Sequence, residues 1–437
     1  MADNGQQEDG GDPANLYAFA ASRHSLSLAW RRAILALWVF APAALLLYTL
    51  ALSSGCGPGF GASEVTSTVS TTSTSTPGPR SGQVLIVGGE SAGSKILSSA
   101  ELYQPATAKF KAAEPMATAR MFHTATVLQD GKVLIAGGLG TGSSVLASAE
   151  LYDPATGAFT KTGAMTAARY FHTATLLQNG NVLIAGGIGS SGSVLQSAEL
   201  YDPSSGTFAA TGTMVNPRAL HAAALITTGT QSGAVLLCGG VANSSGTLID
   251  NTAELYDPTS GSFTAVGNML DSLFGLKATA FASGTLAGSV LIAGGQDNFG
   301  VVGNLELYNQ TTSLFGLAGL MSTSRIQFTA TLLQTGAVLY AGGLNGSGNV
   351  VASADLYTPG VGISATGAMT DSRRYHTATM FTSGTLAGQV LIAGGQDAAS
   401  VANTVATAEI YSPSSGTFAA TGTMTSSRFG HTATLLP

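Results

Sequence analysis

The sequence is poor in charged residues and in cysteine. Only 9% of its 437 residues are charged, the net charge is −6, and the 17 basic side chains are spread thinly. No stretch gathers the basic residues that would neutralise a run of phosphates, so nucleic acid is not an expected partner. Cys56 and Cys238 are too few for a disulfide framework. The 45% apolar content excludes a chain that is disordered throughout.

The first 80 residues differ from the rest of the chain. Residues 1–32 begin with a polar, Gly-rich stretch and end in Arg31 and Arg32, and we expect them to be disordered and cytoplasmic. Residues 33–52 are an apolar run without a charge, long enough to cross a bilayer about 30 Å thick. Residues 57–80 consist largely of Ser, Thr, Gly and Pro, which predicts a flexible linker.

The apolar run ends in Leu-Ser-Ser-Gly-Cys, which resembles a bacterial lipoprotein signal with Cys56 as the lipidated residue. The run is longer than the apolar core of a usual signal peptide, so an uncleaved transmembrane segment over residues 33–56 is the other interpretation. Both interpretations predict the same placement. The rest of the chain would be tethered to a membrane on the extracytoplasmic side of the cell envelope.

One unit recurs seven times over residues 81–437. Each copy contains an apolar run ending in Gly-Gly, a run close to Ala-Glu-Leu-Tyr, a segment around an aromatic residue, and a run similar to His-Thr-Ala-Thr-Leu-Leu. These short runs are bounded by turn residues and show no helical period. Asp130-Gly131 and Asn179-Gly180 predict tight hairpins of the mirror-image type. Four antiparallel strands per unit predict an all-β fold, a seven-bladed β-propeller.

The ends of the repeat region are incomplete in complementary ways. The first copy begins at Val84 with its second run, and the last copy ends with a first run over residues 431–437. We therefore expect the C-terminal strand to pair with the first blade and to close the ring without a covalent bond. Closure of this kind removes exposed strand edges.

The diglycine after four apolar residues, followed by a spaced Tyr and a large aromatic residue, resembles the kelch repeat. The usual Trp of the fourth strand is Phe in this chain, which indicates a divergent bacterial branch. Galactose oxidase, which this chain resembles in its kelch-type repeats, has a copper site that needs a tyrosine cross-linked to a cysteine, two histidines and a second tyrosine. Because Cys238 lies in a predicted core strand and Cys56 in the signal, that site is not assembled here. We expect no cofactor, no metal and no catalytic residue.

Several polar residues recur at fixed positions of the unit. Five copies carry a His, six carry an Arg and all seven carry an acid in the third run. Equivalent positions on different blades lie too far apart for one metal ion, so we expect each His to be packed and hydrogen-bonded within its own blade. The arginines and acids are interpreted as structural ion pairs or as groups that satisfy the backbone, with a charged ring that binds a ligand as the alternative.

Binding residues are sought where one copy departs from the others. In kelch propellers the loops after the second strand and those between blades share one face, on which partners dock. The expected function is therefore recognition of a protein or glycan through these loops, with a carbohydrate-active or oxidase-type enzyme at the propeller channel as the alternative. Neutral drift of the loops is the other explanation of the departures. The candidate residues are Phe274, Asp297, Phe299, Arg374, Tyr375 and Asp397.

Overall fold

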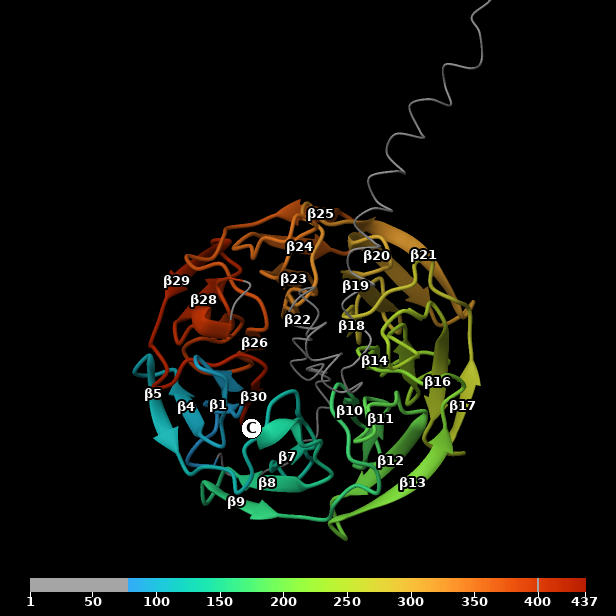
Figure 1. Cartoon of the computed structure of the whole chain (residues 1–437). Coiled ribbons are helices and arrows are strands. Elements are labelled where there is room, and N and C mark those ends of the chain that lie inside the picture. The colour runs from blue at the N-terminus through green and yellow to red at the C-terminus, as the bar shows by residue number, and fades with distance from the viewer. Residues whose placement is uncertain (1–77, 399–400) are drawn as a thin grey trace, which may run out of the picture.

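The computed structural model describes residues 78–398 and 401–437. Seven four-stranded antiparallel sheets stand as blades around a central axis (Figure 1), which confirms the predicted fold. Residues 33–56, with the predicted membrane segment and Cys56, lie outside the described residues. Among the residues that are described, no helix has the length and apolarity needed to span a membrane.

Each blade has an innermost, a second, a third and an outer strand. We number the blades from 1, formed by β30, β1, β4 and β5, to 7, formed by β26 to β29. The innermost strands are β6 (Thr124–Val127), β10 (Thr173–Leu176), β14 (Ala222–Leu225), β18 (Lys277–Ala280), β22 (Thr329–Leu332), β26 (Thr377–Met380) and β30 (Thr432–Leu435). The second strands are β1 (Val84–Val87), β7 (Val133–Ala136), β11 (Val182–Ala185), β15 (Val235–Cys238), β19 (Val290–Gln296), β23 (Val338–Ala341) and β27 (Val390–Ala393).

The outer half of each blade completes the sheet. The third strands are β4 (Ala100–Gln104), β8 (Ala149–Asp153), β12 (Ser197–Asp202), β16 (Ala253–Asp257), β20 (Val301–Asn309), β24 (Ala354–Thr358) and β28 (Ala408–Ser412). The outer strands are β5 (Lys109–Ala113), β9 (Ala158–Lys161), β13 (Thr207–Thr213), β17 (Ser262–Ala265), β21 (Leu314–Leu320), β25 (Gly362–Ala365) and β29 (Thr417–Ala420). Short additions are β2 (Glu90–Ser91), β3 (Lys95–Ile96), and the 3-10 turns η2 (Thr141–Ser143) and η3 (Val401–Asn403).

The second strands form the centre of the core. Their four apolar residues are buried in every blade, because each blade packs both of its faces against its neighbours. This two-sided burial explains why these runs are continuously apolar and do not alternate with polar residues. Farther out, the Tyr of the third strand faces the Phe of the outer strand, as in the pair Tyr152 and Phe159, whose ring centroids lie 4.9 Å apart.

The ring closes as the sequence predicts. β30 pairs with β1 in antiparallel register, with Val84 opposite Leu435 and Val87 opposite Thr432. In Figure 1 the C-terminus lies beside β30 and β1. The chain therefore joins its last strand to its first blade by backbone hydrogen bonds and by the packing of Leu436 into the core.

The predicted turn type is wrong. The Gly131 N–H donates to the Leu128 carbonyl, the Leu128 N–H donates to the Lys132 carbonyl, and only Gly131 of the central residues has a positive φ, at 84°. A mirror-image turn needs positive φ at both central residues, and Asp130 does not adopt it. The connection is a three-residue hairpin with Gly in the left-handed position, and residues 177–181 repeat its hydrogen bonds.

Removal of residues 430–437 is expected to lower the midpoint of thermal unfolding by at least about 10 °C, because it deletes β30 and exposes the edge of β1. Circular dichroism melts of the full chain and the truncated chain measure the shift. Removal of the exposed Pro437 alone is the matched control and should leave the melt unchanged. An unchanged melt after the longer deletion would contradict the closure.

Candidate functional site

The repeated arginines and acids form buried ion pairs, as predicted. Each Arg lies in the linker before an innermost strand and reaches the third strand of that blade. Arg169 Nη2 lies 2.9 Å from Glu199 Oε1, and Arg169 Nη1 donates to the Gly186 and Ser197 carbonyls. The pairs are Arg120–Glu150, Arg169–Glu199, Arg218–Glu254, Arg325–Asp355, Arg373–Glu409 and Arg428–Glu101.

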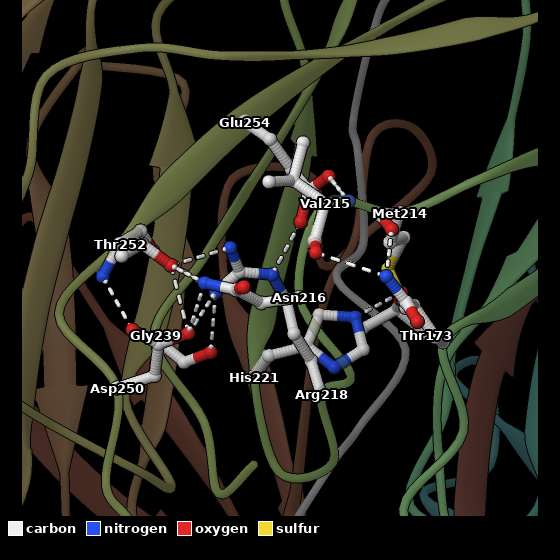
Figure 2. Close-up of polar contacts among 11 residues, drawn as sticks. Thr173, Met214, Val215, Asn216, Arg218, His221, Gly239, Asp250, Thr252 and Glu254 are labelled. Carbon is white, nitrogen blue, oxygen red and sulfur yellow. Dashed lines mark hydrogen bonds and ion pairs between the residues drawn. The ribbon is translucent and has the colours of Figure 1, made fainter.

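Figure 2 shows the pair between blades 3 and 4. Arg218 lies between Glu254 and Asp250, with its Nε 2.7 Å from Glu254 Oε1 and its Nη1 3.3 Å from Asp250 Oδ2. Glu254 also accepts a hydrogen bond from the Val215 N–H of the linker. Each such carboxylate thus fixes both a guanidinium and the linker backbone. These residues hold neighbouring blades together and are not available to a ligand.

The interface between blades 4 and 5 lacks the arginine. Buried Leu273 stands in its place, and Glu306 accepts hydrogen bonds from the N–H groups of Leu270 and Asp271. Burial raises the pKa of Glu306, and the described residues form no ion pair with it. Phe274, a predicted site residue in this linker, packs into an apolar cluster and is buried.

The histidine prediction is wrong in one respect. Each His bonds to the innermost strand of the preceding blade and not within its own blade, because the innermost strands are each other's closest neighbours at the axis. His221 Nε2 lies 2.9 Å from Thr173 Oγ1, as Figure 2 shows. Burial lowers the pKa of His221 and of His376 to about 3. Within the described part of the chain, no group of three His, Cys, Asp or Glu residues could hold a metal ion.

One face of the propeller carries the connections from second to third strands and the linkers between blades. We call it the loop face. Short bridges join the two kinds of segment, as between Met121 and Leu139 or between Tyr170 and Ile188. In an antiparallel blade the second strand and the outer strand run in the same direction. The connections that follow these two strands therefore leave every blade on the same face of the propeller. The predicted sharing of one face is therefore confirmed.

At the centre of the loop face, one residue from each linker adopts a positive φ. Backbone hydrogen bonds join several neighbours, as where the Leu220 N–H donates to the Phe171 carbonyl and the Tyr375 N–H donates to the Gln327 carbonyl. A left-handed conformation is costly for a residue other than Gly, so the surrounding ring must impose it. We call these seven residues the central ring: Phe122, Phe171, Leu220, Gly275, Gln327, Tyr375 and Gly430.

Most of the central ring belongs to an apolar plug. Phe122 and Phe171 stack edge to face with centroids 4.7 Å apart. In four blades the residue that follows the diglycine is apolar and packs in the same cluster: Leu139, Ile188, Val241 and Leu344. These apolar residues therefore form part of the hydrophobic core and leave no polar group for a ligand. The other three blades have Glu90, Gln296 and Gln396 at this position.

Between blades 5 and 7 the plug becomes polar. Gln327 replaces an apolar ring residue, Arg374 replaces an apolar residue beside the ring, and Gln396 follows the diglycine of blade 7. We call Gln327, Arg374, Tyr375 and Gln396 the polar sector; all four are buried. Arg374 Nη1 donates to Gln327 Oε1 at 3.2 Å, and its guanidinium lies 5.1 Å from the centroid of the Tyr375 ring.

The predicted candidates do not form one site. Arg374 and Tyr375 lie together in the polar sector, and exposed Asp397 lies at its rim. Phe299 is 90% exposed at a loop tip in blade 5. Asp297 Oδ1 accepts hydrogen bonds from the N–H groups of Phe299 and Gly300, so this carboxylate shapes its own loop.

Sequence reasoning missed Gln327 and Gln396. Both depart from the repeat, but their significance depends on the central ring, whose geometry the sequence does not show. It also missed Lys277, a half-buried residue on innermost strand β18 where most copies have Thr. Burial lowers the pKa of Lys277 to about 7.

Comparisons with known proteins show the fold. The family model for the β-propeller of tRNA wybutosine-synthesizing protein 4 matches residues 115–304, less than half of the chain. The structure of YjhT is 15% identical over 61% of this chain and 91% of that chain, with a TM-score of 0.49. A fungal alcohol oxidase of the AA5 family, in complex with copper, is 19% identical over 72% of this chain and 68% of that chain, with a TM-score of 0.55. No curated protein matches the sequence.

The described residues do not fit a copper site like that of galactose oxidase. That site requires a cysteine beside a tyrosine, with histidines converging on the metal. Cys238 is buried in β15, burial raises the pKa of its thiol to about 12, and the five repeated histidines point into blade interfaces. No step of a reaction is therefore assigned to a metal in this part of the chain.

Substitution of Arg169 by Met is expected to destabilise the fold by about 3–5 kcal/mol, because it leaves the Glu199 carboxylate buried without its partner. Chemical denaturation followed by circular dichroism measures the change. Lys132→Met is the matched control, because it breaks an exposed pair with Asp130 and should cost less than about 1 kcal/mol. Equal effects of the two substitutions would contradict the structural role of the buried pair.

Stability is expected to fall as the pH drops from about 6.5 towards 3. Burial holds the folded-state pKa of His221 at about 3, below the unfolded value of about 6.5, so acid favours the unfolded chain. The double variant Thr173→Ala/His221→Leu copies the natural pair Ala222 and Leu276 of the neighbouring interface. It should remove up to about 1.4 kcal/mol per pH unit from this slope in pH-dependent melts. An unchanged slope would show that His221 is not buried in its neutral form.

Proposed function

We propose that this propeller is a non-catalytic binding module that recognises a glycan or a protein through its loop face. One observation carries the proposal: Gln327, Arg374 and Gln396 place polar groups in a plug that is apolar over blades 2 to 4. Scaffold residues repeat from blade to blade, whereas a ligand needs polar groups at one place only. Buried polar groups without partners cost stability, and a fold retains them where they bind something.

The proposal also includes the repeat type and the membrane attachment that the sequence predicts. We propose a kelch-type propeller that is tethered to a membrane by residues 33–52 or by a lipid on Cys56. The linker 57–80 would then present the loop face to the extracytoplasmic side of the envelope. The apolar run and the Cys56 sequence support this placement.

An enzyme at the propeller channel is the second candidate function, and Lys277 favours it. A lysine whose pKa is lowered to about 7 is partly neutral at physiological pH and can act as a base or nucleophile. Glycan cleavage by the full chain, lost in Lys277→Met and retained in Gln327→Leu/Gln396→Leu, would support this candidate against the binding module.

The variant Gln327→Leu/Gln396→Leu tests the binding module. It gives the polar sector the apolar residues of other blades, since Leu220 and Leu344 occupy the equivalent positions. We expect it to keep the circular dichroism spectrum of the natural chain and to lose at least about tenfold in binding to an array of neutral and acidic glycans.

Val361→Ala, an exposed position in the turn between β24 and β25 on the opposite face, is the control and should leave binding unchanged. If the full chain binds none of the glycans and no peptide, or if the sector variant binds as well as the natural chain, the binding module is wrong.

A further inference from the structure

We propose that Arg374 receives the carboxylate of an acidic sugar, which its guanidinium would hold through two parallel hydrogen bonds. This inference rests on the proposed binding function and specifies the chemistry of its ligand.

Arg374 is the exception among the buried arginines of the described residues. The six arginines of the repeat are paired with carboxylates at 2.7–3.1 Å. Arg374 is equally buried, at 0% exposure, and no carboxylate of the described residues pairs with it. Among the described residues its side chain donates one hydrogen bond, to the neutral amide oxygen of Gln327. A buried charge needs a counter-charge, and the described residues supply none, which points to a bound anion.

The geometry of the guanidinium specifies the kind of anion. Nη1 is occupied by Gln327, while Nε and Nη2 have no partner among the described residues. These two nitrogens direct their N–H groups along the same edge of the planar guanidinium. That edge matches the two oxygens of a carboxylate, which Arg binds in a bidentate manner. The two unpartnered donors, both buried, therefore have the arrangement that a planar carboxylate requires.

Neighbouring groups hold the guanidinium in this orientation. The Tyr375 ring lies 5.1 Å from the Arg374 guanidinium carbon and stabilises the cation through its π face. The backbone of Arg374 is fixed by two hydrogen bonds with Gln396, one in each direction, both at 2.9 Å. The donor edge is thus positioned before a ligand arrives, which lowers the entropy cost of binding.

The remaining polar atoms favour a sugar over a peptide. Gln327 Nε2 and both amide atoms of Gln396 are buried and have no partner among the described residues. They supply donors and an acceptor, which suit hydroxyl groups next to a carboxylate. A peptide would need free backbone groups for strand pairing, but the backbone of Arg374 and Gln396 is already paired. A uronic acid has both the carboxylate and the hydroxyl groups.

Calorimetric titration of the full chain with galacturonate and glucuronate tests the inference. We expect binding to both or to one of them, with at least about tenfold weaker binding of the neutral sugars galactose and glucose. Arg374→Met should lose the preference for the acidic sugar. Arg374→Lys should recover only part of it, because a lysine cannot form the two parallel bonds.

Thermal melts separate a binding role from a structural one. Without ligand, Arg374→Met should melt at or above the temperature of the natural chain, because it removes an uncompensated buried charge. Arg169→Met is the matched control and should melt several degrees lower, because Arg169 is paired. A decrease in Arg374→Met as large as in Arg169→Met would overturn the inference and make Arg374 a structural residue.

The remaining outcomes distinguish this inference from the function on which it rests. Equal binding of acidic and neutral sugars, with no effect of Arg374→Met, would overturn the inference and leave the binding module in place. Binding of a peptide with a free C-terminal carboxylate, but not of its amidated form or of uronates, would overturn the choice of a sugar. Failure to bind any of these probes would count against the inference and the binding module together.

Discussion

The pairing of β30 with β1 is the interaction on which the rest of the structure depends. Each blade buries both faces of its second strand against neighbouring blades, so an open ring would expose two apolar faces and two strand edges. Closure also brings Arg428 of the last linker to Glu101 of the first blade. The ion pairs and the central ring can form in all blades only when the circle is complete.

Within the closed ring, two kinds of buried arginine show the difference between scaffold and site. The arginines of the repeat pair with carboxylates of the same chain. This pairing offsets the free-energy cost of burying the guanidinium groups. Arg374 lies at the centre of the loop face without such a partner, beside the amides of Gln327 and Gln396. The propeller provides a rigid frame in which a few departures from the repeat can create a polar site. Its fold alone assigns no activity.

The sequence predicted the fold well because the repeat carries its own evidence. Seven diglycines, seven third-strand acids and the orphan runs at both ends determine blade number and closure without three-dimensional information. Arg374 and Tyr375 were found as departures from the repeat. Gln327 and Gln396 were not, because their importance arises from a ring of left-handed residues that only the structure shows. The hairpin type and the partner of each His were wrong, since both depend on local backbone geometry and blade spacing.

A crystal structure of the full chain grown with galacturonate tests the central claim most directly. The account predicts the sugar carboxylate against the free edge of Arg374, with its oxygens about 2.7–2.9 Å from Nε and Nη2, and its hydroxyl groups near Gln327 and Gln396. A carboxylate bound elsewhere, or an Arg374 that turns to a carboxylate of its own chain, would contradict it.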